Sequence, residues 1–394
     1  MVFSKKPLHI LIAIVIACLP LIGAANNPQD TVTVHTESHA NAHPGVSHEA
    51  HQAVEKGLTP EQHKEAETKE FIKHHLLDSH DFHLFSYGSE SGHETHVGFP
   101  LPVILWDDGL HVFSSSKFEH GHAVAESNGN YYKINHHNGK IYKTDAQGNL
   151  SEDAKGHVTN EQPIDFSITK NVFMILVTGL IMFLLFAGLG KSYAKNGSIA
   201  KGAGRFFEPI IIYIRDEIAI PNIGEKHYRK YMSFLLTIFF FVWFLNIFGL
   251  TPLGVNVTGN IAITAALAII AYIITTFTAK KDYWGHIFWM PGVPVPMKFV
   301  LAPIELLGTI IKPFSLMIRL YANILAGHVV LMSLIALMYK ANSAIGSPLA
   351  FLLSFVLTLL EVLVALLQAY IFTMLSALYF GSAVEEHHHD EAHH

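Results

Sequence analysis

Two apolar stretches near the C-terminal end of the chain constrain its fold more than any other feature. They cover residues 299–338 and 349–384, which are 40 and 36 residues long. A helix rises about 1.5 Å per residue, so either stretch exceeds the ~30 Å hydrocarbon thickness of a bilayer. Each must therefore tilt far beyond the usual ~20° or break, and Pro313 is the expected kink in the first stretch.

Three shorter apolar stretches have the length of ordinary membrane crossings. They cover residues 171–190, 232–250 and 260–279, and the first has 20 residues without a charge. The connection between the two long stretches, residues 339–348, contains Asn, Ser, Gly and Pro, which favour a turn. We therefore predict an all-α polytopic membrane protein with five membrane helices, of which the last two form a strongly tilted antiparallel hairpin.

Basic residues indicate the orientation of these helices. Between the first two crossings lie Lys191, Lys195, Lys201, Arg205, Arg215, Lys226, Arg229 and Lys230. Basic loops stay in the cytoplasm, and the loop between the second and third crossings has no Lys or Arg. The N-terminal part is therefore expected outside the cell inner membrane and the C-terminus in the cytoplasm. Within the basic loop, residues 206–220 are predicted to form one helix along the membrane surface.

The N-terminus has the features of a secretory signal peptide over residues 1–25. Lys5 and Lys6 precede an apolar run, and small residues follow that run. Two alternatives stay open: a lipid attached to Cys18, and an uncleaved anchor helix, for which the run is short. The predicted organisation is then a signal peptide, an exported module at 26–165, a membrane domain at 166–384 and a cytoplasmic tail at 385–394.

The exported module is acidic and holds 18 of the 27 histidines. Its residues 26–57 lack hydrophobic periodicity and are predicted to be disordered, and a short helix is expected from Pro60. A small β-rich domain around residues 83–150 is indicated by the turn signal Asn138-Gly139 and by four segments with strand character. These segments are residues 97–106, 109–113, 131–135 and 140–144. Pro100 and Pro102 make the first segment an edge strand at best.

Several functional classes are excluded or disfavoured by composition. The single cysteine rules out a disulfide framework, and a net charge of −6 with only four arginines gives no basic face for nucleic acid. Since the chain has no phosphate-binding glycine loop, we expect no catalysis and no cofactor. His93 with His96 and His120 with His122 have the spacing of metal ligands. We favour solvated histidines over a metal site, because the surrounding sequence is largely of low complexity.

Polar residues inside the long hairpin call for a functional explanation, because a charge at membrane depth costs at least ~2.5 kcal/mol. They are Glu305, Lys312, Ser315, Arg319, Asn323, His328, Glu361 and Gln368. If the hairpin turns midway through residues 339–348, Arg319 lies level with Gln368. In the same register, His328 and Glu361 differ in height by only about 3 Å. Two polar pairs therefore agree on one register.

A proton-exchanging pair beside a fixed cation is what rotary ion transfer requires. His328 and Glu361 can take up and release protons near neutral pH. Arg319 cannot release its proton, but it attracts a carboxylate that has just lost one. Two offset aqueous paths separated by Arg319 would force each ion to ride on a moving partner. The rival interpretation is a secondary transporter or channel whose exported domain captures metal, which predicts an internal repeat that the sequence lacks.

Residues 312–328, KPFSLMIRLYANILAGH, resemble the signature of the subunit a family of F-type ATP synthases, the Fo proton-channel subunit. Glu361, with Gln368 seven residues later, resembles the pattern in the last helix of that family. Residues 246–252, NIFGLTP, resemble another of its motifs. The likeness covers about residues 170–386. It departs at Gly249, where some relatives carry an aspartate, and in the long exported module.

The resemblance implies a stator subunit that carries protons to and from a ring of c subunits and so couples ion flow to rotation and ATP synthesis. Arg319 is then the essential arginine beside the ring carboxylate. The implied lining residues are Asn323, His328, Glu361 and Gln368 for the outer half-channel and Glu305 and Ser315 for the inner one. Further implied partners are the b subunits of the peripheral stalk, the other Fo and F1 subunits and membrane lipid.

Overall fold

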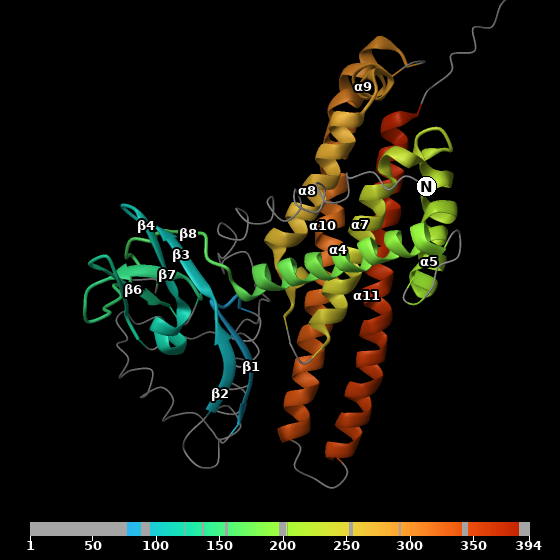
Figure 1. Ribbon diagram of the computed structural model, residues 1–394. Coiled ribbons are helices and arrows are strands. Elements are labelled where there is room, and N and C mark those ends of the chain that lie inside the picture. The colour runs from blue at the N-terminus through green and yellow to red at the C-terminus, as the bar shows by residue number, and fades with distance from the viewer. Residues whose placement is uncertain are drawn as a thin grey trace, which may run out of the picture.

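The computed structural model describes residues 77–87, 95–121, 123–135, 138–153, 157–196, 202, 204–251, 255–290, 293–340 and 346–385. The expected signal peptide, the segment at 26–57, the helix from Pro60 and the tail beyond residue 385 lie outside these ranges. Most of the described chain is helical, and a smaller β-rich part precedes the first long helix (Figure 1).

Five of the described helices are long and apolar enough to cross a membrane, as the sequence predicts. They are α4 (Lys170–Asn196), α7 (Tyr228–Gly249), α8 (Ile261–Thr278), α10 (Val295–Lys340) and α11 (Gly346–Val384). Asn260 caps α8, because its side-chain oxygen accepts a hydrogen bond from the backbone N–H of Ala262 at 3.0 Å. The chain is thus a polytopic, mostly helical membrane protein.

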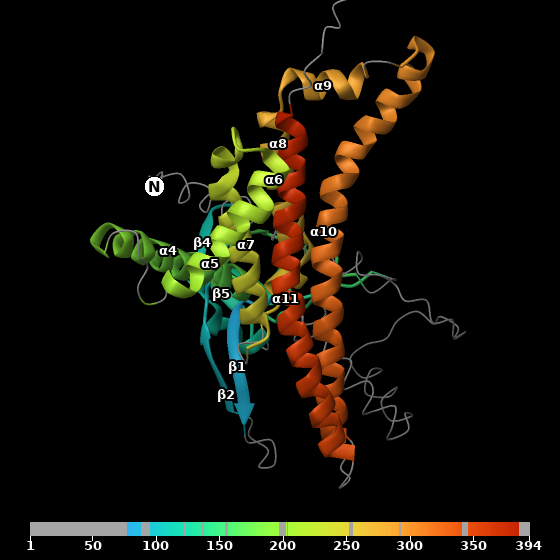
Figure 2. The same cartoon turned by 90° about the vertical axis from the view of Figure 1, so that its right-hand side faces the viewer.

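Helices α10 and α11 run side by side and form the predicted long hairpin (Figures 1 and 2). They have 46 and 39 residues, or about 69 and 58 Å at ~1.5 Å per residue. Pro303 and Pro313, the position of the expected kink, lie inside α10, and the helix does not break at either residue. A proline removes one backbone hydrogen bond, but the helix continues through it, and α10 bends away from α11 toward its N-terminal end (Figure 2).

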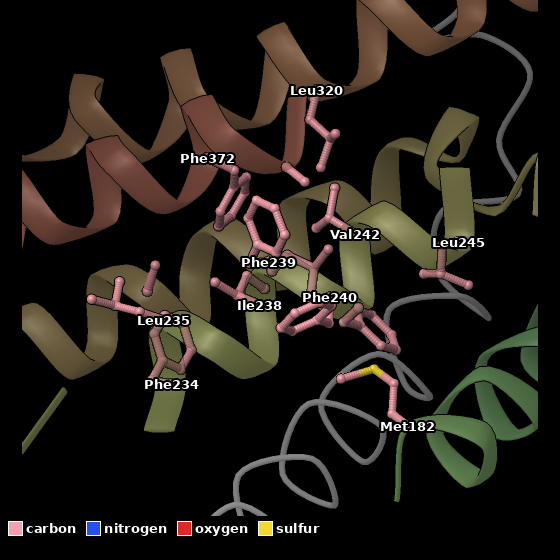
Figure 3. Close-up of a cluster of buried hydrophobic side chains, with 14 of the residues drawn as sticks. Met182, Phe234, Leu235, Ile238, Phe239, Phe240, Val242, Leu245, Leu320 and Phe372 are labelled. Atoms are coloured by element: carbon pink, nitrogen blue, oxygen red, sulfur yellow. The ribbon is translucent and has the colours of Figure 1, made fainter. Parts of the chain in front are cut away.

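Helix α4 runs across the long hairpin at a large angle in Figure 1 and lies to one side of α10 and α11 in Figure 2. Helix α7 is packed between α4 and α11, and 11 of its 22 residues are buried. Figure 3 shows Phe240 of α7 beside Met182 of α4, and Phe239 beside Phe372 of α11. A helix that is apolar on all sides belongs at the centre of a bundle, and α7 has that place here.

The segment between α4 and α7 is helical, in agreement with the predicted helix at residues 206–220. It consists of α5 (Gly204–Tyr213), a π-helical turn η4 (Ile214–Ala219) and α6 (Ile220–Ile223). Arg215 Nε donates a 2.6 Å hydrogen bond to Asp216 Oδ1, while Ile214 and Ile218 are buried. The short helix α9 (Lys281–Phe288) connects α8 to α10.

Among its described residues, the β domain (residues 77–165) has eight short strands in three antiparallel sheets. The strands are β1 (Asp81–Tyr87), β2 (Thr95–Pro100), β3 (Pro102–Trp106), β4 (Leu110–Ser114), β5 (Ala125–Ser127), β6 (Asn130–Ile134), β7 (Ile141–Thr144) and β8 (Ile164–Asp165). The sheet orders are β1-β2, β4-β3-β8 and β5-β6-β7. The domain thus exists as predicted but extends beyond residues 83–150 at both ends.

The prediction of an edge strand at residues 97–106 is wrong in its second half. The chain divides there into β2 and β3, and β3 is the central strand between β4 and β8. Pro102 is tolerated because it is the first residue of β3. The other predicted segments occur as β4, β6 and β7, and Gly139 has the positive φ of 69° that the turn before β7 requires. Strands β5 and β8 have three and two residues, too short to show a period in the sequence.

The β domain and the membrane helices share one hydrophobic core. Phe82 of β1, Leu101 and Val172 of α4 are all buried in it. Phe173 of α4 meets the stacked rings of Phe82 and Phe99 edge-on, with ring centroids 5.4 and 5.3 Å away. This packing fixes the β domain to the first membrane helix.

Candidate functional site

A cavity of about 300 Å³ lies between the long hairpin, α7 and the short turn η5 (Val257–Gly259). Its wall combines apolar residues with a concentrated set of polar side chains. The polar ones are Asn246, Asn256, Thr258, Asn323, His328, Glu361 and Gln368. The structure therefore brings together all four residues that the sequence assigns to the outer half of a proton path.

The register of the hairpin is set by a close contact between α10 and α11. A Cβ atom added to Gly327 would lie only 2.9 Å from Oε1 of Glu361. Gly327 precedes His328, so the acidic residue of α11 faces α10 at the height of the histidine, as the sequence register predicts. Both His328 and Glu361 are buried, with 4% and 8% of their surface exposed.

The second oxygen of Glu361 is buried as well. Among the described residues, Oε2 of Glu361 has no hydrogen-bond partner. Burial of an ionised carboxylate without a hydrogen-bond partner costs free energy. A carboxyl group that can take up a proton from the cavity avoids that cost. The geometry thus suits a site that takes up and releases a proton.

The opposite wall of the cavity comes from residues that the sequence does not single out as lining a path. Thr258 donates a 2.6 Å hydrogen bond to the side-chain oxygen of Asn246, and Asn246 donates one of 3.5 Å to the backbone oxygen of Ala365 on α11. Asn256 accepts a 2.9 Å hydrogen bond from the backbone of Gly259 and so shapes η5. A polar Asn246 inside an apolar helix is the signal that could have indicated this wall.

Gly249 also lines the cavity. This is the position at which the chain departs from the aspartate of some relatives. With no side chain at position 249, the polar groups of this wall come from Asn246, Asn256 and Thr258 instead.

The structure does not bring Arg319 into this cavity. Arg319 lies on an exposed face of α10, and so do Ser315 and the apolar side chains of Phe314 and Ile318. The guanidinium acts electrostatically on Tyr379 of α11. Arg319 and the polar cavity are therefore next to each other along α10 but open onto different surroundings.

A second, narrow cavity of about 10 Å³ lies on the other side of Arg319 along α10. Lys312, Thr309, Tyr379 and Tyr283 contribute to its wall. The hydroxyl of Tyr379 donates a 3.5 Å hydrogen bond to the backbone oxygen of Lys312, whose ammonium group lies 5.8 Å from the Tyr379 ring centroid. The sequence assigns Glu305 and Ser315 to this side, but neither lines the narrow cavity. Glu305 is half-buried and interacts electrostatically with Tyr283.

The described ranges contain no group of three or more His, Cys, Asp or Glu side chains that could hold a metal ion. His93 and His122, each one member of the two histidine pairs that have the spacing of metal ligands, lie outside those ranges.

Comparisons with known proteins divide the chain in the same way as the fold does. The model of the family described as ATP synthase A chain matches residues 172–381, and a domain of unknown function matches residues 71–166. ATP synthase subunit a of Chloroherpeton thalassium is 40% identical over 235 residues, which cover 58% of this chain and 70% of the relative. The subunit a of Myxococcus xanthus is 40% identical over 238 residues, covering 58% and 77%. That of Anaeromyxobacter sp. is 35% identical over 257 residues, covering 61% and 62%.

Proposed function

Because the chain belongs to the ATP synthase A chain family and is thus a non-catalytic membrane subunit of the ATP synthase complex, we propose that it carries protons through two offset half-channels that meet at Arg319. Protons from the exported side reach the c-subunit ring through the cavity of about 300 Å³, by way of Asn323, His328, Glu361 and Gln368. The inner half-channel passes Glu305 and Ser315 and opens to the cytoplasm. Family membership favours this function over the secondary transporter considered from the sequence.

The separation of Arg319 from the buried polar cavity is the observation that carries the proposal. A guanidinium keeps its charge at any physiological pH, so no proton can pass through it along α10. A proton that reaches the cavity must therefore leave the chain, travel on a partner and return beyond Arg319. Ion flow is coupled to rotation by this detour.

The surroundings of Arg319 indicate the partner. Phe314 and Ile318 are 56% and 42% exposed on the same helix, which is an apolar face for contact inside a membrane. A charged guanidinium on such a face cannot be solvated by lipid and needs an acidic group opposite it. A ring of c subunits that presents one carboxylate at a time meets that requirement. The b subunits of the peripheral stalk would hold the chain against the ring's rotation.

We further propose that the predicted topology holds for this chain. Residues 1–25 are removed as a signal peptide, residues 26–165 are exported, residues 166–384 form the membrane domain and residues 385–394 lie in the cytoplasm. If α4 follows the membrane normal, the large angle at which it crosses α10 and α11 gives the strong tilt that their length requires (Figure 1).

The central test is Arg319→Ala in inverted membrane vesicles that contain the whole ATP synthase. We expect ATP-driven proton pumping to be lost while c subunits still co-purify with the chain. Arg229→Ala is the matched control, because Arg229 is an exposed arginine at the start of α7, outside the proposed path. Retained pumping in Arg319→Ala, with the control also active, would overturn the proposal.

A second test concerns the outer half-channel. Glu361→Gln keeps the size of the side chain but removes the exchangeable proton. We expect this variant to slow proton flux at least tenfold. A flux equal to that of the unmodified complex would exclude Glu361 from the path.

A further inference from the structure

The sheet formed by β4, β3 and β8 has apolar side chains on both of its faces. On its inner face, Val103 and Leu105 of β3 and Phe113 of β4 are buried in the core of the β domain. An antiparallel sheet whose other face meets water usually carries polar residues on that face. The outer face of this sheet is formed by large apolar side chains instead.

Strand pairing places these side chains in two rows across the outer face. In the first row, Trp106 of β3 lies opposite Leu110 of β4 and Ile164 of β8. The second row runs through Ile104, whose backbone oxygen accepts a 2.8 Å hydrogen bond from the backbone N–H of Phe166. Residues two apart along a strand point to the same face, so the two rows are continuous. We call this surface the sheet patch; it consists of Ile104, Trp106, Leu110, Val112, Ile164 and Phe166.

The sheet patch is exposed over most of its extent. Apart from Ile104, which is half-buried, its side chains are between 54% and 59% exposed. Single exposed apolar residues are common on proteins, whereas a contiguous apolar patch marks a surface that meets another protein, a ligand or a membrane. The composition of the sheet is therefore that of a sheet covered on both faces.

The sheet patch is joined to the first membrane helix by a short, hydrogen-bonded stretch of chain. The backbone N–H of Ile168 donates a 3.1 Å hydrogen bond to the backbone oxygen of Pro102, so the pairing with β3 continues almost to α4. Lys170 is the first residue of α4 and of its apolar, membrane-spanning stretch. Phe166 precedes Lys170 by four residues, which span at most about 13 Å at ~3.3 Å per residue. Figure 1 shows the chain passing from β8 directly into α4.

From this arrangement we propose that the sheet patch rests in the lipid leaflet on the exported side of the membrane, beside the point at which α4 enters the bilayer. The inference rests on the proposed topology, in which the β domain is exported. Tryptophan is enriched at the boundary between lipid and water, where Trp106 would lie. An apolar surface at that boundary is typically immersed by about 5–10 Å. The β domain is then a second, peripheral anchor of the chain.

The charges next to the sheet patch favour burial of apolar surface over attraction to anionic lipid. Asp107 and Asp108 directly follow Trp106 in the turn between β3 and β4, and the side chain of Asp108 is 89% exposed. Anionic headgroups attract basic segments, not carboxylates. We therefore expect the sheet patch to enter a bilayer of phosphatidylcholine, which has no net charge.

The test places a fluorophore on the sheet patch of the whole ATP synthase in phosphatidylcholine liposomes. Val112→Cys is labelled with a nitrobenzoxadiazole group in a complex whose other reactive cysteines are replaced by serine. We expect its fluorescence to fall at least about twofold when the lipid carries a nitroxide on its acyl chain. Ala146→Cys is the matched control, because Ala146 is exposed in the turn after β7 of another sheet. Its fluorescence should respond to iodide in the water and not to the nitroxide lipid.

Two results would overturn the inference. If iodide quenches the label at position 112 as strongly as the label at position 146, the sheet patch faces water. If neither iodide nor the nitroxide lipid quenches the label at position 112, another protein surface covers the sheet patch.

A charge variant tests whether the apolar side chains cause the docking. Leu110→Glu combined with Ile164→Glu introduces two carboxylates at exposed positions of the sheet patch. We expect this variant to lose the quenching of the position 112 label by the nitroxide lipid, while Ala146→Glu retains it. Unchanged hydrogen exchange of the β3 amides would confirm that the β domain is still folded. Undiminished lipid quenching in the double variant would contradict the inference.

Failure of this inference can be told apart from failure of the proposed topology, and neither measurement depends on proton pumping. Ala146→Cys should react with a membrane-impermeant maleimide added to intact spheroplasts. If it reacts only in inverted vesicles, the β domain is not exported and the inference falls with the topology. If it reacts in spheroplasts but the lipid does not quench the label at position 112, the topology stands and only the inference is wrong.

Discussion

Gly327→Ala tests whether the hairpin holds the Glu361 carboxyl group in one position. The added methyl carbon would lie 2.9 Å from Oε1 of Glu361, whereas ordinary contacts begin at 3.4 Å. The carboxyl group, at the end of a flexible side chain, must then retreat by about 0.5 Å. In a tightly arranged site, a misplacement of about 1 Å can lower the rate by a factor of ~100. The displacement here is about half as large, so we expect proton flux to fall about tenfold.

The assay compares ATP-driven acidification of inverted vesicles with the amount of c subunit that co-purifies. Alanine stabilises a helix by about 0.5–1 kcal/mol relative to glycine, so lost helix stability cannot explain a loss of flux. Gly308→Ala is the matched control in α10, because a Cβ atom there meets nothing within 4 Å. Combining Gly327→Ala with Glu361→Asp, which shortens the side chain, should recover part of the flux. Normal pumping by Gly327→Ala would refute the reasoning.

Two predictions concern stability. Burial alone would lower the pKa of His80 and raise that of Asp165, but their mutual hydrogen bond and charges raise the first and lower the second. The pair therefore contributes its full stabilisation to the β domain between about pH 4 and 6.5. The contribution decreases when the pH rises through the raised pKa of His80. It also decreases when the pH falls through the lowered pKa of Asp165. Asp165→Asn should lower the stability of the β domain by about 1–3 kcal/mol near pH 6. Faster hydrogen exchange of the β3 amides in the full chain would reveal this loss, and unchanged exchange would contradict the prediction. In Gly381→Ala the added methyl group would clash with the backbone oxygen of Asn222 in α6, so the variant should be destabilised by about 1–3 kcal/mol. Thermal unfolding measures this, with Gly285→Ala as the control, because a Cβ atom at position 285 meets no other atom within 4 Å. Equal unfolding temperatures for the two variants would contradict the prediction.

The sequence predicts the helices well because length and apolarity are local properties. Each of the five long apolar stretches is a helix, and the bounds differ by only a few residues. The register of the hairpin was also predictable, since a short connection and rigid helices leave little freedom, and the Gly327–Glu361 contact agrees with it. Proline was the least informative signal. The helix runs through Pro313, and Pro102 begins a central strand. In each case the neighbouring parts of the chain decide whether the absence of a backbone N–H on proline removes a needed hydrogen bond.

The sequence by itself therefore determined the set of membrane helices. It also determined the register of the hairpin, that is, which polar residues of α10 and α11 lie at the same height. The tertiary structure decided what no spacing could reveal. It placed Asn246 and Thr258 in the wall of the cavity that His328 also lines, and it turned Arg319 to an exposed face. The physical reason is that periodicity records which side of one helix is polar, whereas a cavity forms from several elements that are distant in sequence and meet only when the chain packs.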